Sequence, residues 1–297
     1  MALFPSKNSI TKINDETQNT EIYFRANDEI KGECTLIPYD ANPFIINNLK
    51  IELIGEIHTK NLDYKLEFIY ITQELSNEEE LVFEKKYPFS FNKISGNYES
   101  YNGEIFEIVY FLRVTLSTSI LDLKKYEERI IYIYRPITDE FYHSISYSKI
   151  EHILGRIGTQ NIKIIFNLDK NKFFINEPIR GKIIISEINN IKINSINLSL
   201  IKNEKINGKI ENYILSSFEM CDGQPMTGDI IPIRIYINNH KKVSITMKNI
   251  NNGSCWLRYY LKLTIILENE NDTLFKSQEI IILRSERVLN ELLETEI

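Results

Sequence analysis

Hydrophobic and polar residues alternate along much of this chain, which is the pattern of β-strands with one buried face. The stretch EIVYFLRVTLS, which begins at Glu107, is a clear example. Arg113 and Thr115 fall on one face of this stretch, and the opposite face carries Ile108, Tyr110, Leu112, Val114 and Leu116. The pattern predicts a half-buried strand.

Several other segments are rich in β-branched residues and bounded by polar turns, as strands are. They are IIYIYR at Ile130, IKIIFNL at Ile162, RGKIIIS at Arg180, INSINLSLI at Ile193 and IPIRIYI at Ile231. Helical periodicity is limited to SNEEELVFEKK, which begins at Ser76, and to the tail SERVLNELLETEI, which begins at Ser285. Many short strands with polar turns predict an all-β protein built from antiparallel sandwiches.

Two pairs of segments repeat at the same spacing. YFLRVTL at Tyr110 returns as YYLKLTI at Tyr259, 149 residues later. NDEIKGECTLI at Asn27 returns as NEPIRGKIIIS at Asn176, also 149 residues later. This offset is about half of the 297 residues and far longer than the roughly 20–50 residues of a solenoid repeat. It predicts one domain duplicated, as lobes 1–145 and 146–297, with the boundary inside the segment from Arg135 to Asn161.

The composition is that of a soluble globular chain, with 43% hydrophobic and 26% charged residues. A net charge of −6 argues against nucleic-acid binding, which needs clustered Lys and Arg. No apolar run approaches the roughly 20 residues of a membrane-spanning helix. The first residues, MALFPSKNSITKINDE, lack a secretory signal, and the three cysteines Cys34, Cys221 and Cys255 show no CxxC spacing. We interpret the chain as intracellular, with buried thiols.

Motifs that carry chemistry are missing. The histidines His58, His143, His152 and His240 have no acidic or cysteine neighbours at zinc-ligand spacing. The chain has no GxSxG, phosphate loop or GxGxxG motif. CDG at Cys221 is better interpreted as a turn at Asp222 and Gly223 than as a nucleophile. We therefore expect no enzymatic activity, no cofactor and no metal site.

Three segments together resemble the vacuolar protein sorting-associated protein 26 family, the arrestin-fold subunit of the retromer coat. They are YESYNGEIFEIVYFLRVTL with LDLKKYEE, MCDGQPMTGDIIPIRIYI, and LRYYLKLTIILENENDTLFKSQEIIILR. The resemblance runs in order from roughly Glu21 to Arg284. It implies two arrestin-like β-sandwich lobes in tandem, which agrees with the duplication.

The resemblance also implies a non-enzymatic adaptor in endosomal sorting and in retrograde and recycling transport of membrane cargo. Such an adaptor is cytoplasmic and peripheral on endosomal membranes, and its recruitment to them is indirect. Its implied partners are the helical-solenoid retromer subunit, sorting nexins and the cytoplasmic tails of membrane cargo, and not nucleic acid.

In this family a loop of the C-terminal lobe docks onto the solenoid subunit, and the matching loop here is NNHKKVSITMKNINNGS, Asn238 to Ser254. Its end, Asn249 to Ser254, has no Lys or Arg, although the family's loop is usually more basic there. We therefore expect the contact to rest on Ile245, Thr246, Met247 and Lys248. We predict that Ile245→Asp with Met247→Asn abolishes solenoid binding and leaves the unfolding midpoint almost unchanged.

A cargo site is expected where NIKIIFNL opens the second lobe, because the family places a strand near bound cargo there. If Ile162 to Asn167 formed an exposed edge, a cargo tail could add to it as a further strand. The residues assigned to this cargo-binding edge strand are Ile162, Ile164 and Phe166. The alternative is that the strand is paired on both sides inside its sheet.

Two other functions stay open at this point. One is a different arrestin-fold trafficking adaptor, such as the related subunit of the retriever complex, which a pulldown distinguishes by the solenoid that it recovers. The other is a β-sandwich enzyme or carbohydrate-binding module, which would show a metal site or an aromatic sugar groove. Trp256 is the single tryptophan, and in a strand it is expected in the core.

Overall fold

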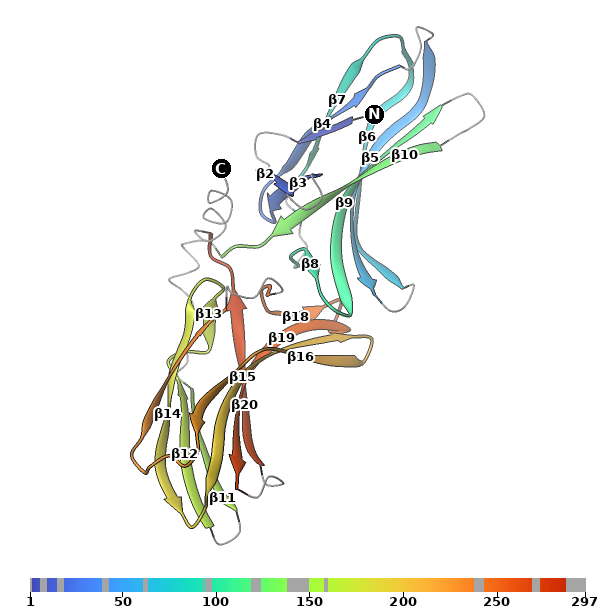
Figure 1. Ribbon diagram of the computed structural model, residues 1–297. Coiled ribbons are helices and arrows are strands. Elements are labelled where there is room, and N and C mark those ends of the chain that lie inside the picture. Colours follow the sequence, from blue (N-terminus) through green and yellow to red (C-terminus); the bar gives the residue numbers. More distant parts are fainter. Residues whose placement is uncertain are drawn as a thin grey trace. The chain divides into compact units, whose positions relative to one another are not determined.

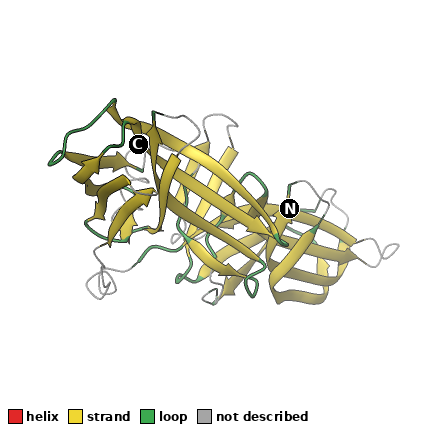
Figure 2. Cartoon of the chain, turned by 90° about the horizontal axis from the view of Figure 1, so that it is seen from below, coloured by secondary structure: helices red, strands yellow, loops and turns green. Residues whose placement is uncertain are grey.

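The prediction of an all-β protein is confirmed by a computed structural model of the chain (Figure 2). The structure describes residues 2–5, 10–14, 19–38, 43–60, 64–92, 94, 98–118, 124–137, 150–157, 160–237, 243–268 and 273–286. Among these residues no helix is long and apolar enough to cross a membrane. The tail from residue 287 onward lies outside the described residues, so its predicted helix stays a prediction.

The chain divides into two compact units between Arg135 and Pro136. The predicted boundary at residues 145 and 146 falls outside the described residues, so that position stays a prediction. Each unit has its own pair of sheets and its own buried core. We call the two units the first and the second lobe.

The first lobe consists of a three-stranded and a seven-stranded sheet. The small sheet has the order β1-β4-β7, and the large sheet has the order β2-β3-β10-β9-β5-β6 with β8 paired to β9. The strands are β1 (Ala2–Pro5), β2 (Ile10–Asn14), β3 (Asn19–Arg25), β4 (Ile30–Leu36), β5 (Phe44–Thr59), β6 (Lys65–Leu81), β7 (Lys85–Phe91), β8 (Tyr101–Asn102), β9 (Phe106–Thr118) and β10 (Lys124–Tyr134).

The second lobe repeats this plan with a four-stranded and a six-stranded sheet. Their orders are β11-β12-β14-β17 and β13-β20-β19-β15-β16, with β18 paired to β19. The strands are β11 (Ile150–Ile157), β12 (Gln160–Leu168), β13 (Lys172–Phe174), β14 (Pro178–Asn189), β15 (Ile193–Ile206), β16 (Lys209–Asp222), β17 (Ile230–Tyr236), β18 (Met247–Ile250), β19 (Cys255–Leu267) and β20 (Thr273–Leu283). In Figure 1, β15, β19 and β20 lie side by side.

The duplication inferred from the sequence extends to strand pairing. The order β3-β10-β9-β5-β6 of the first lobe matches β13-β20-β19-β15-β16 of the second, and β1-β4-β7 matches β12-β14-β17. Both lobes contain one short parallel pair at the same place, β3 with β10 and β13 with β20. The two repeated strands, β9 and β19, occupy equivalent central positions. Every second residue of β19 from Cys255 to Leu267 is buried, as the alternation predicts.

The helix predicted near Glu78 is wrong. Residues Ser76 to Leu81 complete β6, which pairs with β5 from Phe44 opposite Leu81 to His58 opposite Lys65. All positions of this edge strand before Leu81 are exposed or half-buried, and of its glutamates only Glu79 is half-buried. Pairing along the whole length of β5 overrides the local helix propensity of the Glu-rich run.

Candidate interaction surfaces

The segment predicted to bind the solenoid is held on the six-stranded sheet of the second lobe. The backbone N–H of Thr246 donates to the carbonyl of Ile282 at 2.9 Å. The N–H of Ile282 in turn donates to Thr246 Oγ1 at 2.8 Å. One residue later β18 begins, and Met247 lies opposite Leu257 of β19. Residues 238–242 of the predicted loop lie outside the described residues.

The four predicted residues differ in exposure. Met247 is only 5% exposed and belongs to the core, whereas Ile245 and Thr246 are half-buried. Lys248 is exposed, and its Nζ lies 3.1 Å from Glu279 Oε1. The expectation that Met247 contributes little to the core is therefore wrong, because its side chain packs inside its own lobe. Lys248 and Ile245 remain accessible to a partner.

Aromatic and basic side chains lie beside Lys248 on the outward side of β19. Trp256 is half-buried rather than in the core as expected, because it lies between the buried Cys255 and Leu257 on the outward side of β19. The guanidinium of Arg258 stacks on its ring at 4.8 Å. Lys205 of β15 lies opposite Trp256 in the strand register, and it also lies opposite Ile210 of β16. We call Lys205, Ile210, Lys248, Trp256 and Arg258 the β18 face. Trp and Arg are the residue types in which interface energy concentrates.

The predicted cargo edge is wrong, because β12 has a partner on each side. It pairs with β11 through Ile153 opposite Ile165, and with β14 through Phe166 opposite Ile183. The three assigned side chains, Ile162, Ile164 and Phe166, are all buried in the core. The edges of this sheet are β11 and β17. No backbone groups of β12 are therefore free to accept a further strand.

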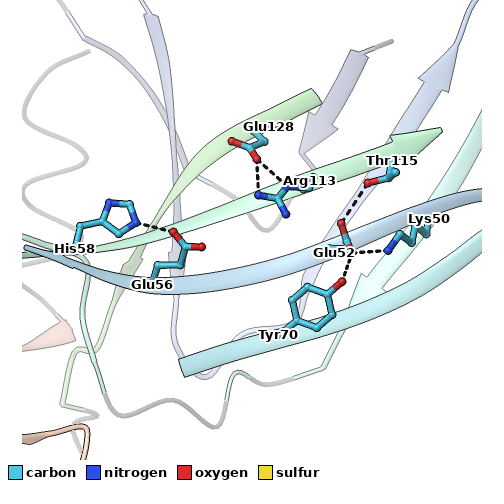
Figure 3. A network of polar contacts seen from close by, with 8 residues as sticks. All are labelled: Lys50, Glu52, Glu56, His58, Tyr70, Arg113, Thr115 and Glu128. Carbon is cyan, nitrogen blue, oxygen red and sulfur yellow. Dashed lines mark hydrogen bonds and ion pairs between the residues drawn. The ribbon is translucent and has the colours of Figure 1, made fainter. Parts of the chain in front are cut away.

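The first lobe carries a network of polar side chains on the outward side of its large sheet (Figure 3). Glu52 of β5 is almost fully buried there, and it accepts hydrogen bonds from Lys50 Nζ at 2.6 Å, from Thr115 Oγ1 at 3.2 Å and from Tyr70. Burial acts to raise the pKa of the Glu52 carboxyl, but hydrogen bonds from Lys50 and Tyr70 outweigh it and hold the pKa below its ordinary value. The network fixes the geometry of this face.

Two further contacts extend the network along β5 and β9. Arg113 binds Glu128 of β10 through both Nε and a terminal nitrogen, each at 2.7 Å. The two ring nitrogens of His58 contact Glu56 Oε2 at 2.6 Å and Glu107 Oε1 at 3.1 Å. His58 is thus a surface cross-link between strands. Among the described residues, no three His, Cys, Asp or Glu side chains are grouped as metal ligands.

The cysteines are poor candidates for nucleophiles. Cys34 and Cys255 are buried as predicted, and burial raises the pKa of the Cys34 thiol to about 11. Cys221 is half-exposed, contrary to the prediction, yet partial burial also raises the pKa of its thiol. A reactive cysteine needs a lowered pKa instead. The interpretation of Asp222 and Gly223 as a turn agrees with the end of β16 at Asp222 and with the positive φ of 79° at Gly223.

Comparison with known families gives a match over most of the chain. The family described as vacuolar protein sorting-associated protein 26 matches residues 6–270. The matched range spans both lobes and includes β18 and its neighbouring strand β19. It therefore includes the first two of the resembling segments in full and the beginning of the third, which runs from Leu257 to Arg284.

Individual relatives carry the same description. Vacuolar protein sorting-associated protein 26B of Arabidopsis thaliana is 30% identical over 268 residues, which cover 88% of this chain and 84% of that protein. Protein 26B-B of Xenopus laevis is 32% identical over 242 residues, covering 80% and 68%. Protein 26B of Homo sapiens is 28% identical over 280 residues, covering 92% and 80%.

Proposed function

The chain belongs to the vacuolar protein sorting-associated protein 26 family, and we propose that it docks the helical-solenoid subunit of retromer through the β18 face of its second lobe. The family is a retromer subunit that acts in vacuolar and endosomal protein sorting. The chain then works as a non-enzymatic adaptor on the cytoplasmic side of endosomal membranes, and further partners are sorting nexins and the tails of membrane cargo.

The observation that carries the proposal is the position of Lys248. It is exposed in β18, the short strand inside the predicted loop, and it lies on the same side of the sheet as Trp256 and Arg258. A partner that approaches the loop therefore also meets an aromatic ring and a guanidinium that are already stacked. Because these side chains are already ordered, less conformational entropy is lost when the partner binds.

Electrostatics specify the partner's chemistry. The β18 face carries the three cations Lys205, Lys248 and Arg258 next to the apolar side chain of Ile210. We expect the solenoid helix that docks here to present carboxylates around an apolar centre, since opposite potentials across an interface favour association. Met247 supports the face from within the core and makes no direct contact with the partner.

The experiment is a titration of the solenoid subunit with the chain carrying Lys248→Glu. We expect affinity to fall by about thirtyfold, the effect of losing one hot spot of about 2 kcal/mol. Lys192→Glu is the matched control, because Lys192 is also an exposed lysine of the second lobe, paired with Glu268 at 3.0 Å. Lys192 lies at the opposite end of β19 from the β18 face, because its partner Glu268 directly follows Leu267, the last residue of that strand. Equal affinities of both variants and the wild type would contradict the docking site.

A further inference from the structure

The outward side of the four-stranded sheet in the second lobe is basic. Inward positions such as Phe166, Ile183 and Ile233 are buried in the core. The exposed positions that alternate with them carry Lys163 of β12, Arg180 and Lys182 of β14, and Arg234 of β17. We call these four residues the basic face.

The cations of the basic face make no ion pair with any part of the chain that the structure describes. Exposed lysines elsewhere do, as Lys85 does with Glu79 and Lys192 with Glu268. The chain as a whole is acidic, with 41 Asp and Glu against 35 Lys and Arg. Carboxylates for pairing are thus plentiful, yet none of those on the described residues forms an ion pair with these four exposed cations.

Two arginines of the basic face lie directly opposite each other. Arg180 and Arg234 are partners in the register of β14 and β17. Like charges opposite each other in a sheet are destabilising, and a bound anion removes that repulsion. Asp169 and Glu187 are the carboxylates described on the same side of the sheet, next to Arg180 and opposite Lys163. These two carboxylates do not neutralise the positive charges of Lys182 and Arg234.

Apolar side chains border the basic face along its edge strand. Ile230 of β17 is 60% exposed, and Met226, in the loop before it, is 73% exposed. Tyr236 is exposed at the other end of β17 and stacks against the guanidinium of Arg234 at 5.2 Å. Cations, an interfacial tyrosine and protruding aliphatic side chains on one side are typical of surfaces that contact lipid headgroups.

We propose that the basic face binds the anionic headgroups of a lipid bilayer directly. The cations are spread over three neighbouring strands of one sheet face, which suits a planar array of headgroups better than a single extended peptide. Pro232 lies between Ile230 and Arg234 in the edge strand β17, and its missing N–H weakens the addition of a peptide strand there. The inference rests on the proposed function only in that endosomal sorting brings the chain to a membrane.

The test is co-sedimentation of the full chain with vesicles. We expect binding to vesicles of phosphatidylcholine with phosphatidylserine, none to phosphatidylcholine alone, and weakening as salt is added. Arg180→Gln with Lys182→Gln and Arg234→Gln should weaken binding by about a hundredfold, since each cation near an anionic surface contributes about fivefold. A separate variant, Ile230→Ser, should also weaken binding, because it removes an apolar contact with the bilayer.

The matched control is Lys65→Gln with Lys125→Gln and Lys276→Gln. These lysines are exposed on other strands, and their removal changes the net charge equally. The control should bind vesicles as the wild type does, and neither triple variant should melt below the wild type, since replacing Arg180 and Arg234 removes a like-charge pair. If the triple variant of the basic face melts lower, Arg234→Gln alone is used, with about a fivefold loss expected.

Three results would overturn the inference. The first is equal vesicle binding by the two triple variants, and the second is no vesicle binding by the wild type. The third is that the triple variant of the basic face loses binding to a polyglutamate peptide but binds vesicles as the wild type does, which would assign the basic face to an acidic protein. Titration with the solenoid subunit separates this inference from the proposed function, because the triple variant of the basic face should retain wild-type affinity for it.

Discussion

Lys202 and Glu204 form an ion pair inside the second lobe. Their side chains are 1% and 0% exposed, and Lys202 Nζ lies 2.7 Å from Glu204 Oε1. Both occupy the inward side of β15, in line with the buried Leu198 and Leu200. A buried charge that loses its partner is strongly destabilising, whereas an apolar replacement of both partners often is not. The effects of substituting Lys202 and Glu204 on the stability of the lobe should therefore not be additive.

We predict that Glu204→Leu alone lowers the free energy of unfolding of the second lobe by about 3 kcal/mol or more. Adding Lys202→Met should recover most of that loss, because the two charges of the ion pair are then removed together. Denaturant unfolding followed by the fluorescence of Trp256, the single tryptophan, reports on this lobe. If the single variant were as stable as the wild type, the pair would not be part of the packed core.

The buried side chain of Met247 is predicted to stabilise the second lobe. Because its side chain is buried, we expect Met247→Ala to lower the free energy of unfolding of the second lobe by about 2 kcal/mol. Lys248→Glu, one residue away and exposed, should leave it within about 0.5 kcal/mol of the wild type. Trp256 fluorescence measures both variants. Equal stabilities would mean that β18 does not pack on the lobe.

At the scale of elements, two glycines lie where strands approach closely. A Cβ at Gly181 of β14 would lie 2.2 Å from the backbone oxygen of Asn167 in β12. A Cβ at Gly55 of β5 would instead lie 2.9 Å from Cζ of the Phe68 ring. A ring can turn aside, but the carbonyl of a paired strand cannot move without breaking the ladder. The two sites therefore tolerate a methyl group differently.

We predict that Gly181→Ala lowers the free energy of unfolding of the second lobe by about 3 kcal/mol, the upper part of the usual range for overpacking. Gly55→Ala should destabilise the first lobe by only about 1 kcal/mol, because Phe68 yields. Calorimetry resolves the two lobes when Trp256 fluorescence assigns the transition of the second. A larger effect at Gly55 than at Gly181 would contradict the argument.

Glu52 makes the stability of the first lobe depend on pH. Its pKa is lowered in the folded state, so its contribution to stability is present above the unfolded-state pKa and is lost as pH falls through the folded one. We expect the first lobe to lose stability as pH falls below about 4.3, the ordinary value for Glu. Glu52→Gln should melt lower at neutral pH and depend less on pH in that range.

The control for this pH series is Glu67→Gln, which removes an exposed carboxylate on the neighbouring strand β6. Its melting temperature should follow the wild type at each pH. Calorimetry of all three proteins from neutral to acidic pH gives the comparison. Parallel curves for Glu52→Gln and the wild type would show that the lowered pKa of Glu52 does not stabilise the fold.

Local alternation predicts elements where one face of a strand meets the core. It identified β9 and β19 correctly, because every second side chain is buried along the whole of β19 and from Phe106 to Val114 of β9. It failed at Ser76 to Leu81, where pairing with β5 decides the conformation. Local alternation also failed to predict that β12 lies inside its sheet. The edge beside it is formed by β11, whose sequence IEHILGRI alternates weakly and so did not indicate a strand. Sheet order is a property of distant pairings that a local pattern does not contain.

At the scale of the whole molecule, the repeat at 149 residues predicted the architecture, since two copies of one sequence pattern fold into two copies of one sheet topology. The interaction surfaces were less predictable. The exposure of Lys248 and the burial of Met247 depend on how β18 lies against β19. The basic face depends on the register that sets Arg180 opposite Arg234. Both require the folded arrangement of strands far apart in the sequence.

Affinity purification of the tagged full chain from its source cells, followed by mass spectrometry, tests whether the chain is a retromer adaptor. We expect recovery of the helical-solenoid subunit of retromer with the wild type and with Lys192→Glu, and its loss with Lys248→Glu. Recovery of the solenoid subunit of the retriever complex in its place would contradict this expectation.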